Sequence, residues 1–248
     1  MGMKASLFRK LPPSVKQGVR RWRYGKLIDR NRFRSEEKEF DILRDIVQPN
    51  DWVVDIGANV GHYTLLLSSL VGKKGRVIAF EPIVQTFDLL SSNVQRAALG
   101  NITLINAAVT NKAGPVGFVI PSGNLYQSHM TTEGGDFVIM GYPLRNFLPQ
   151  DFRVNFLKID AEGCDVQIVK ECADIISRDR PVVMIEVTGV ELTELVDDLS
   201  DYRTMMIHGS HNGFLVPAEA MDRVAKLGLG VCGGDQETRK FSASVTEL

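Results

Sequence analysis

The sequence has few cysteines and no long apolar run. Its three cysteines, Cys164, Cys172 and Cys232, form no CxxC pair, so the pattern favours reduced thiols over a disulfide framework or a structural zinc site. No apolar stretch approaches the roughly 20 residues of a membrane span. Residues 1–34 also lack the uninterrupted apolar segment of a signal peptide. These absences predict a protein of the cytoplasm.

Acidic residues are almost absent from the first 34 positions. That segment holds eleven Lys or Arg against the single acid Asp29, whereas the remainder holds eighteen bases against twenty-nine acids. The acidic body is a poor match to a nucleic acid, whose phosphates need a basic surface, so no nucleic-acid partner is expected. The basic arm could instead contact the inner face of an anionic membrane or a lipid-linked substrate, or it could pack on the protein's own acidic body.

Helical spacing marks two N-terminal segments. The apolar residues Leu11, Val15, Val19 and Trp22 recur at that spacing with Lys and Arg around them, which predicts a short basic amphipathic helix. A second helix is expected over residues 35–47, before Pro49 breaks it. We therefore divide the chain into a basic arm (1–34), a main domain (35–227) and a C-terminal tail that could be flexible (228–248).

Short runs rich in Val and Ile alternate with helical patterns in the main domain. The expected strands are 52–56, 76–80, 102–105, 156–159 and 182–187, and the expected helices are 62–71, 84–98, 165–172 and 192–199. Such alternation predicts an α/β fold with a doubly wound, mostly parallel sheet. Residues 204–207 and 214–216 flank a turn and predict an antiparallel closing pair.

Glycine and proline interrupt the segment 111–135, which we expect to be an irregular connection or a short ribbon over the carboxyl edge of the sheet. A long connection there is commonly a lid or substrate loop, but it can equally be a plain surface insertion. His129 lies in this segment, where it is a candidate base or hydrogen-bond donor, or simply a solvated loop residue.

A glycine-punctuated turn follows the first expected strand. Asp55, Gly57, Asn59 and Gly61 are spaced as GxNxG after an acid, and the glycines allow a ligand to approach the backbone closely. The GxGxxG spacing that seats a pyrophosphate is absent. A carboxylate aimed into this pocket would repel a pyrophosphate and attract the ammonium and sulfonium charges of S-adenosylmethionine.

An acid also ends the second expected strand. Glu81 lies twenty residues past Gly61, where a carboxylate can accept hydrogen bonds from both ribose hydroxyls. Pro82 and Ile83 could flank the adenine, and Asn106, just after the third strand, could bond the adenine edge. Glu81 could otherwise be a surface acid at a helix start, and Asn106 an ordinary turn residue.

Two further acids follow the fourth expected strand. Asp160 and Glu162 lie in the sequence LKIDAEG, at the edge of the sheet where open α/β folds bind their ligands. They are candidates to receive the proton of an acceptor hydroxyl, and Asp160 also to hold the ammonium group of the cofactor. Alternatively the two acids only favour the start of the next helix through its dipole.

The combination of VDIGANVG, FEP, an Asn after the third strand, LKIDAEG and MIEV resembles the FkbM family of methyltransferases over residues 36–188. The resemblance implies a class I Rossmann-like methyltransferase fold, S-adenosylmethionine as cofactor and transfer to hydroxyls of sugars, glycans, glycolipids or natural products. It matches Asp55, Gly57, Asn59, Gly61, Glu81 and Asn106 to cofactor positions, and Asp160, Glu162 and Glu186 to the acidic edge. Where the family usually has threonine-leucine-aspartate, this chain has Pro143 to Asn146, so Arg145 could face an anionic substrate.

We therefore expect an O-methyltransferase acting on a small-molecule or glycan hydroxyl, with no metal. The alternatives are a nucleic-acid methyltransferase and a non-catalytic scaffold that binds adenosylmethionine. The sequence lacks the NPPY or DPPY motif that is typical of base amino-methylation, which argues against the first alternative. A non-catalytic scaffold could have lost Asp55 or Glu81, but both residues are present. The sequence leaves open whether the protein forms a homo-oligomer.

Overall fold

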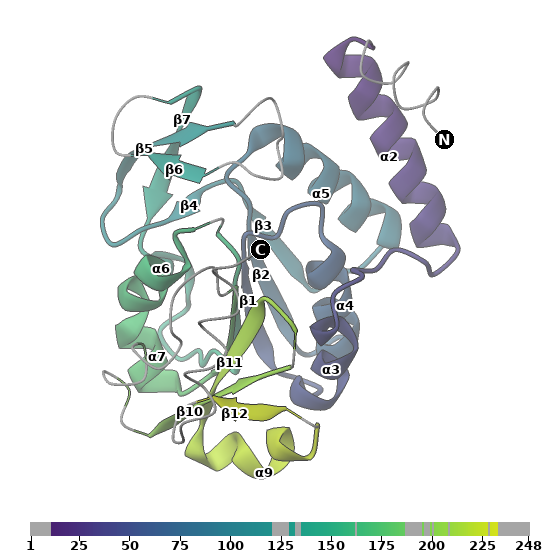
Figure 1. Cartoon of the computed structure of the whole chain (residues 1–248). Helices are drawn as coiled ribbons and strands as arrows, with labels where there is room; N and C mark the ends of the chain where they lie inside the picture. The colour runs from purple at the N-terminus through teal and green to yellow at the C-terminus, as the bar shows by residue number, and fades with distance from the viewer. Residues whose placement is uncertain are drawn as a thin grey trace.

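In the computed structural model, a sheet of eight strands runs through the centre of the protein (Figure 1). The structure describes residues 11–120, 129–131, 135–161, 163–186, 195, 199, 201–207, 209–227 and 229–232. The strands of this sheet are β1 (Trp52–Ile56), β2 (Arg76–Phe80), β3 (Ile102–Ile105), β8 (Phe156–Ile159), β9 (Val182–Glu186), β10 (Tyr202–Met206), β11 (Asn212–Pro217) and β12 (Gly230–Cys232). Their order is β12-β10-β11-β9-β8-β1-β2-β3.

Five neighbouring strands, β3, β2, β1, β8 and β9, pair in parallel. β11 then pairs antiparallel with β9, and β10 antiparallel with β11, so the expected doubly wound sheet and its antiparallel closing pair are both confirmed. β12 pairs with β10, although it lies in the segment that we assigned to the tail. Three residues are too short a run for the pattern of a strand to be recognised in the sequence.

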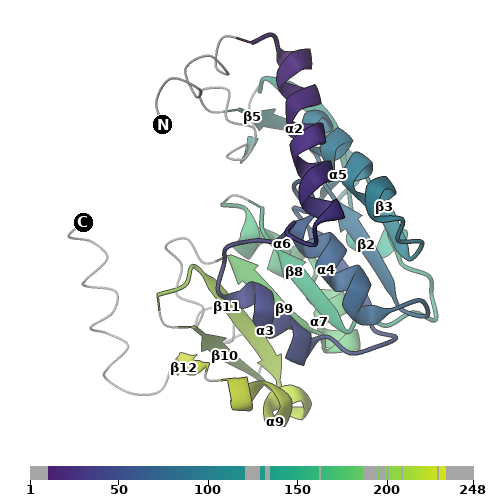
Figure 2. The ribbon, with the colours of Figure 1, turned by 90° about the vertical axis from the view of Figure 1, so that its right-hand side faces the viewer.

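Helices cover both faces of the sheet (Figures 1 and 2). They are α3 (Glu39–Ile46), α4 (His62–Val71), α5 (Val84–Ala97), α6 (Asp165–Glu171), α7 (Ala173–Asp179) and α9 (Met221–Val224). Alternate strand residues face opposite layers, so that Val53 packs with α3 and α4 while Val54 packs with α6 and α7. The carboxyl ends of the parallel strands remain free for a site.

Helix α3 begins four residues later than expected. The hydroxyl of Ser35 accepts a hydrogen bond from the backbone N–H of Glu37 at 3.2 Å, and such a local bond competes with helical geometry. Phe40 and Leu43 of this helix are buried in the core.

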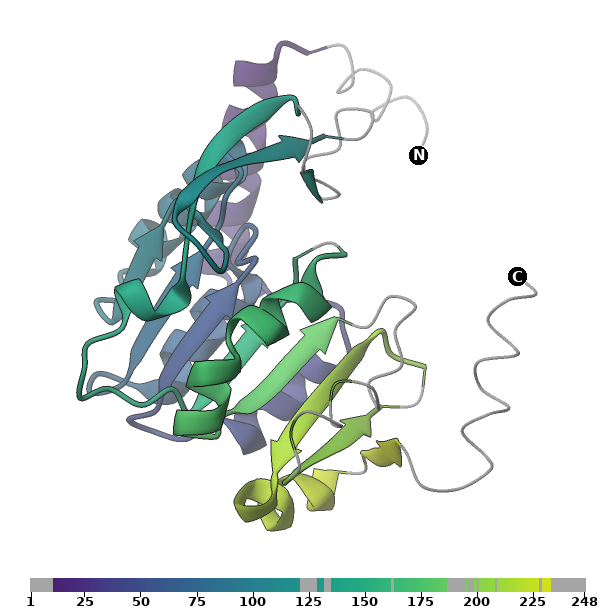
Figure 3. The same ribbon diagram turned by 90° about the vertical axis from the view of Figure 1, so that its left-hand side faces the viewer.

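A second, four-stranded sheet lies beyond the carboxyl end of the parallel strands (Figure 3). Its strands are β4 (Ala108–Val109), β5 (Gly114–Val119), β6 (His129–Thr131) and β7 (Phe137–Tyr142), in the order β4-β7-β5-β6. One face of it packs through Phe118 and Ala108 against Ile83, which precedes α5. The expected ribbon over 111–135 is therefore part of a larger sheet. The alternation that would have revealed β5 is interrupted by Gly117, and its partner β7 lies beyond the segment that we considered.

Helix α2 (Pro13–Asp29) lies along α5 on the outside of the molecule (Figure 2). Arg21 forms an ion pair with Asp88 at 2.6 Å, and Arg96 forms one with Asp29. Beyond its end, Phe33 stacks on His62 with ring centroids 4.2 Å apart, so His62 packs against the segment that follows α2. In the described part of the chain, no helix is both long and apolar enough to cross a membrane.

Candidate active site

The turn between β1 and α4 forms the floor of the site. The backbone N–H groups of Gly57 and Ala58 both donate to the carbonyl oxygen of Phe80, at 3.0 and 2.9 Å, which ties this turn to the end of β2. Gly57 has a φ of +76°, and a Cβ atom there would lie 1.7 Å from the carbonyl oxygen of Asp160. Only glycine allows the loops after β1 and β8 to come this close.

The second glycine of the motif has a different role. Gly61 precedes α4 with a φ of +97°, and a Cβ atom there would lie 2.7 Å from the side chain of Leu90 on α5. It therefore permits close packing between two helices rather than contact with a ligand.

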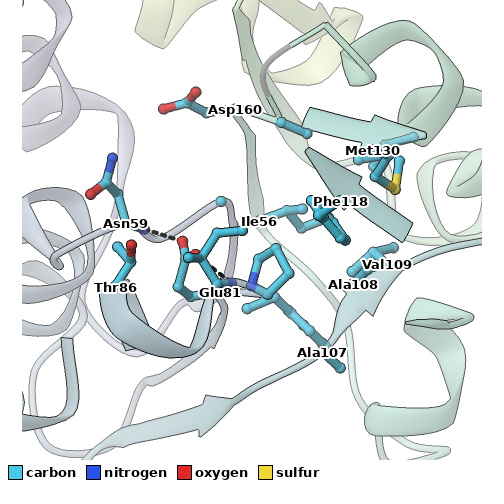
Figure 4. A pocket seen from close by; sticks show the side chains of 16 residues that line it. Ile56, Asn59, Glu81, Thr86, Ala107, Ala108, Val109, Phe118, Met130 and Asp160 are labelled. Carbon is cyan, nitrogen blue, oxygen red and sulfur yellow. Dashed lines mark hydrogen bonds between the residues drawn. The ribbon is translucent and has the colours of Figure 1, made fainter. Parts of the chain in front are cut away.

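Glu81 follows β2 and is 5% exposed. One of its carboxylate oxygens accepts the backbone N–H of Asn59 and the other accepts that of Ile83, each at 2.9 Å (Figure 4). Burial raises the pKa of Glu81 to about 7, and the nearby acids Asp160 and Asp55 add to the rise, while the two N–H donors oppose it. The loops thus hold in place a carboxylate that titrates near neutral pH.

This raised pKa predicts a loss of stability as the pH rises. Between about pH 4.5 and 7 the folded protein retains a proton on Glu81 that the unfolded chain has released, so increasing pH favours unfolding. We expect the parent to lose about 2–3 kcal/mol relative to a Glu81→Gln variant between pH 5 and 8. Urea denaturation of both proteins at each pH measures it. A difference in unfolding free energy that stays constant from pH 5 to 8 would contradict the assignment.

Lys158 connects two acids beneath the site. Its ammonium lies 2.8 Å from a carboxylate oxygen of Asp160 and 3.7 Å from one of Asp55, and it lies over the ring of Tyr63. Thr64 donates a hydrogen bond to Asp55 at 2.7 Å. Burial opposes the charged form of Lys158, but attraction to both carboxylates outweighs it and raises its pKa. Burial raises the pKa of Asp55, which Lys158 and Thr64 oppose.

Our expectation that Asp55 points into the pocket differs from what the structure shows. Its side chain is fully buried, with no exposed surface, and its carboxylate is directed to Lys158 and Thr64. Asp160 is the member of the cluster that reaches the pocket, with 31% of its side chain exposed. The sequence analysis missed Lys158, although a lysine inside an apolar strand two residues before an acid is a usable signal.

The pocket lies between the carboxyl edge of the central sheet and the second sheet (Figure 4). Its polar side chains come from the loops after β1, β2 and β8 and from the first turn of α5, and its apolar wall comes from both sheets and α6. The lining residues are Ile56, Gly57, Asn59, Phe80, Glu81, Pro82, Ile83, Thr86, Ala107, Ala108, Val109, Phe118, Met130, Asp160, Ala161 and Ile168. Six of the expected site residues are among them, namely Gly57, Asn59, Glu81, Pro82, Ile83 and Asp160.

Other expected residues lie elsewhere. The amide of Asn106 donates to the carbonyl oxygens of Glu81 and Pro82, at 2.8 and 3.1 Å, so it braces the loop after β2 and does not line the pocket. Arg145 is exposed and pairs with Asp174 at 3.2 Å, again away from the pocket. Glu162 and the side chain of His129 fall outside the described residues, and both roles stay predictions.

The pocket lining also includes residues that sequence reasoning did not suggest. Thr86 lies in the first turn of α5, while Phe118 and Met130 come from β5 and β6 of the second sheet. A ring and a thioether here could only be foreseen once the second sheet was known to cover this edge.

A known protein family matches most of this chain. The model of the Methyltransferase FkbM domain matches residues 55–216, from the end of β1 to the end of β11. The chain belongs to the FkbM methyltransferase family. This membership confirms the resemblance, the class I fold and the dependence on S-adenosylmethionine that the motifs indicated.

Two proteins of related sequence and one solved structure are similar to this FkbM methyltransferase. Hexuronic acid methyltransferase AglP of Haloferax volcanii is 23% identical over 170 residues, covering 68% of this chain and 69% of that protein. A protein-L-isoaspartate O-methyltransferase of Triticum aestivum is 29% identical over 85 residues, 34% of each chain. The crystal structure of methyltransferase FkbM from Methylobacillus flagellatus KT has a TM-score of 0.52 and 18% identity, covering 67% of this chain but only 43% of that longer protein.

The pocket of this FkbM methyltransferase suits S-adenosylmethionine. Glu81 and Asp160 supply negative charge for a ligand with ammonium and sulfonium groups, and the apolar wall suits an adenine ring. The side-chain oxygens of Asn59 and Thr86 are buried and have no hydrogen-bond partner among the described residues. Buried polar atoms without partners are costly, so a ligand that bonds to them would be stabilised here.

Proposed function

We propose that the protein transfers the methyl group of S-adenosylmethionine to a hydroxyl of a sugar or glycan, which can be lipid-linked; a natural product is the less favoured acceptor. The observation that carries this proposal is the carboxylate of Asp160, which is partly exposed in the pocket and fixed by Lys158 at 2.8 Å. A fixed acceptor at this edge of the sheet is suited to receive a proton from a hydroxyl.

The cofactor would be held by the loops after β1, β2 and β8. Glu81 would accept the ribose hydroxyls, Pro82 and Ile83 would flank the adenine, and Gly57 and Asn59 would allow the backbone to approach the methionyl part. Asp160 would attract the ammonium group as well as serve the acceptor. When bound, the cofactor supplies an electrophilic methyl group on a sulfonium sulfur.

The charge of the pocket favours a neutral acceptor group. Glu81 and Asp160 both line it, and a carboxylate acceptor would meet their like charge, whereas a hydroxyl can donate a hydrogen bond to Asp160. The archaeal relative bears the name of a hexuronic acid methyltransferase, which supports a sugar. We therefore place the new bond on a sugar hydroxyl oxygen rather than on a carboxylate.

The proton should leave late in the transfer. An alcohol is about as weak an acid as water, so a carboxylate cannot remove its proton in advance. As the oxygen–carbon bond forms and the carbon–sulfur bond breaks, with the electron pair leaving on sulfur, the hydroxyl proton moves to a carboxylate oxygen of Asp160. Glu162 and His129 remain candidates for the same task. Holding the reactants in line contributes about 7–11 kcal/mol and the base about 3–5.

Labelled S-adenosylmethionine tests the reaction. The protein is incubated with neutral glycans, uronic-acid glycans, glycolipid extracts and natural-product extracts, and the labelled product is then treated with mild alkali. A methyl ether survives this treatment, whereas a methyl ester is hydrolysed. Label that enters a carbohydrate and resists alkali supports the proposal. Label released by alkali, or found only in nucleic acid or protein, contradicts it.

Replacing Asp160 with asparagine is expected to reduce turnover tenfold or more, because the amide cannot take up the proton. Asp174→Asn is a matched control, since Asp174 lies on α7 and pairs with Arg145 outside the pocket. Steady-state rates on the acceptor identified above, with circular dichroism to verify the fold, measure the effect. If Asp160→Asn turns over as fast as Asp174→Asn, then Asp160 has only a structural role.

We also propose that the protein works in a reducing compartment, the cytoplasm. Two of its cysteines support this, because Cys164 and Cys172 are free thiols in the structure. Cell fractionation followed by thiol alkylation tests this location.

A further inference from the structure

Helix α2 presents an apolar stripe to solvent. Val15, Val19 and Trp22 recur at positions i, i+4 and i+7 and so share one face of the helix. Their exposed fractions are 45%, 40% and 63%. The sequence left open whether the basic arm contacts a membrane or packs on the protein's own body. In the structure α2 lies along α5, but Val15, Val19 and Trp22 stay exposed.

The opposite face of α2 makes the packing contacts. The side-chain amide of Gln17 donates to the carbonyl oxygen of Gln85 at 2.6 Å, and Arg21 pairs with Asp88. Tyr24 and Ile28, which share this face, are half-buried. Contacts at both ends of α2 hold its orientation on α5, so the apolar stripe is turned outward before any partner arrives.

Basic side chains border the exposed stripe. Lys26 continues it at i+11 and places its ammonium 4.1 Å from the ring of Trp22. Arg23 and Arg30 are exposed on the adjacent side. Residues 11–34 hold eight Lys or Arg and one acid, and that acid, Asp29, is already paired with Arg96. The outward face is therefore both apolar and strongly positive.

We propose that this outward face of α2, formed by Val15, Val19, Trp22, Arg23, Lys26 and Arg30, docks on an anionic lipid bilayer. A single helix at the edge of the molecule (Figures 1 and 2) can lie flat in the plane of a membrane interface. Trp22 has the amphipathic ring that favours this interface. The surrounding Lys and Arg complement acidic headgroups.

Neither a second copy of the chain nor an acidic protein is the occupant that we assign. A protein that binds an amphipathic helix usually offers a groove around it, whereas α2 already has one side on α5 and leaves only a shallow stripe. Because the stripe is held in place, docking needs no folding of the helix, and little ordering opposes it. This inference does not depend on the reaction proposed above.

Vesicle co-sedimentation of the full chain tests the docking. Vesicles of phosphatidylcholine alone are compared with vesicles containing phosphatidylglycerol, at low and at high salt. We expect binding to the anionic vesicles only, weakened by salt. Trp22→Ala should reduce partitioning about tenfold, from the loss of apolar contact, and Arg23→Gln with Lys26→Gln by about fivefold for each charge removed.

Two control variants remove basic charge or apolar surface from parts of the molecule outside α2. Lys112→Gln with Arg153→Gln removes two exposed charges from the body, and Val138→Ala trims an exposed apolar residue of β7. Both should bind vesicles like the parent. Three results would each overturn the proposal: no binding to anionic vesicles at low salt, equal binding to neutral vesicles, or equal losses in the control variants. Sedimentation velocity without lipid gives a fourth, if Trp22→Ala abolishes a dimer and so identifies a second copy as the partner.

Discussion

Replacing Lys158 with methionine is expected to lower the free energy of unfolding by about 3–5 kcal/mol, which is the effect of removing one partner from a buried ion pair. Methionine fills similar space but carries no charge. Among the described residues, the fully buried Asp55 would retain only the hydroxyl of Thr64 as a close partner. Urea denaturation at pH 7 measures the loss. The same substitution at exposed Lys170 on α6 should stay within about 0.5 kcal/mol of the parent.

A double variant separates lost charge from lost packing. If the cost arises from an uncompensated carboxylate, then Asp55→Asn introduced into the Lys158→Met protein should recover part of the stability. The loss in the single variant should also shrink toward pH 4, because a buried carboxyl whose pKa is raised takes up a proton as the pH falls. A Lys158→Met protein as stable as the parent, or a double variant no better than the single one, would show that the Lys158 charge does not support the fold.

The sequence could mark Lys158 as unusual, but it could not show which residues Lys158 contacts. A lysine in a strand would ordinarily be expected at an exposed position. Only the pairing of β1 with β8 places it, because Asp55 and Lys158 face each other in the register of the two strands. The sequence contained each residue of this cluster, but their proximity depends on the order of the strands, and local patterns do not fix that order.

The strands of the parallel sheet could be predicted because continuous Val and Ile runs are typical of strands buried on both faces. The packed face of helix α2 was harder to predict, because its sequence carries two sets of apolar residues at helical spacing. We emphasised Val15, Val19 and Trp22, yet the half-buried Tyr24 and Ile28 lie on the packed side. Periodicity identifies a helix, but it cannot choose between two faces when polar contacts such as Arg21 with Asp88 decide the packing.

Within the candidate site, the sequence predicted best the residues whose position follows from a strand end. Gly57, Glu81 and Asp160 follow β1, β2 and β8, and all three line the pocket. Asn106 follows β3 in the same way but turns its amide back to the loop after β2. The end of a strand therefore fixes where a side chain starts, while its partners fix where it points.

Replacing Gly57 with alanine is expected to cost about 2–5 kcal/mol of stability and to abolish binding of S-adenosylmethionine. Two effects combine, since a left-handed backbone costs a residue with a Cβ atom about 1–2 kcal/mol and forcing extra volume into a packed region costs about 1–3. The new atom would overlap the carbonyl oxygen of Asp160, which belongs to backbone and cannot rotate away. The loop bearing Asp160 would have to shift, and the pocket with it.

Two glycines separate the contributions to this loss. Gly72 also has a positive φ, +67°, but a Cβ atom there would meet nothing within 4 Å, so Gly72→Ala reports backbone strain alone. Gly114 has open space and no positive φ, so Gly114→Ala should lie within about 0.5 kcal/mol of the parent. Urea denaturation and calorimetric titration with the cofactor compare all three variants. A Gly57→Ala protein that loses no more stability than Gly72→Ala, and still binds the cofactor, would mean that the close approach of the loops after β1 and β8 is not what builds the pocket.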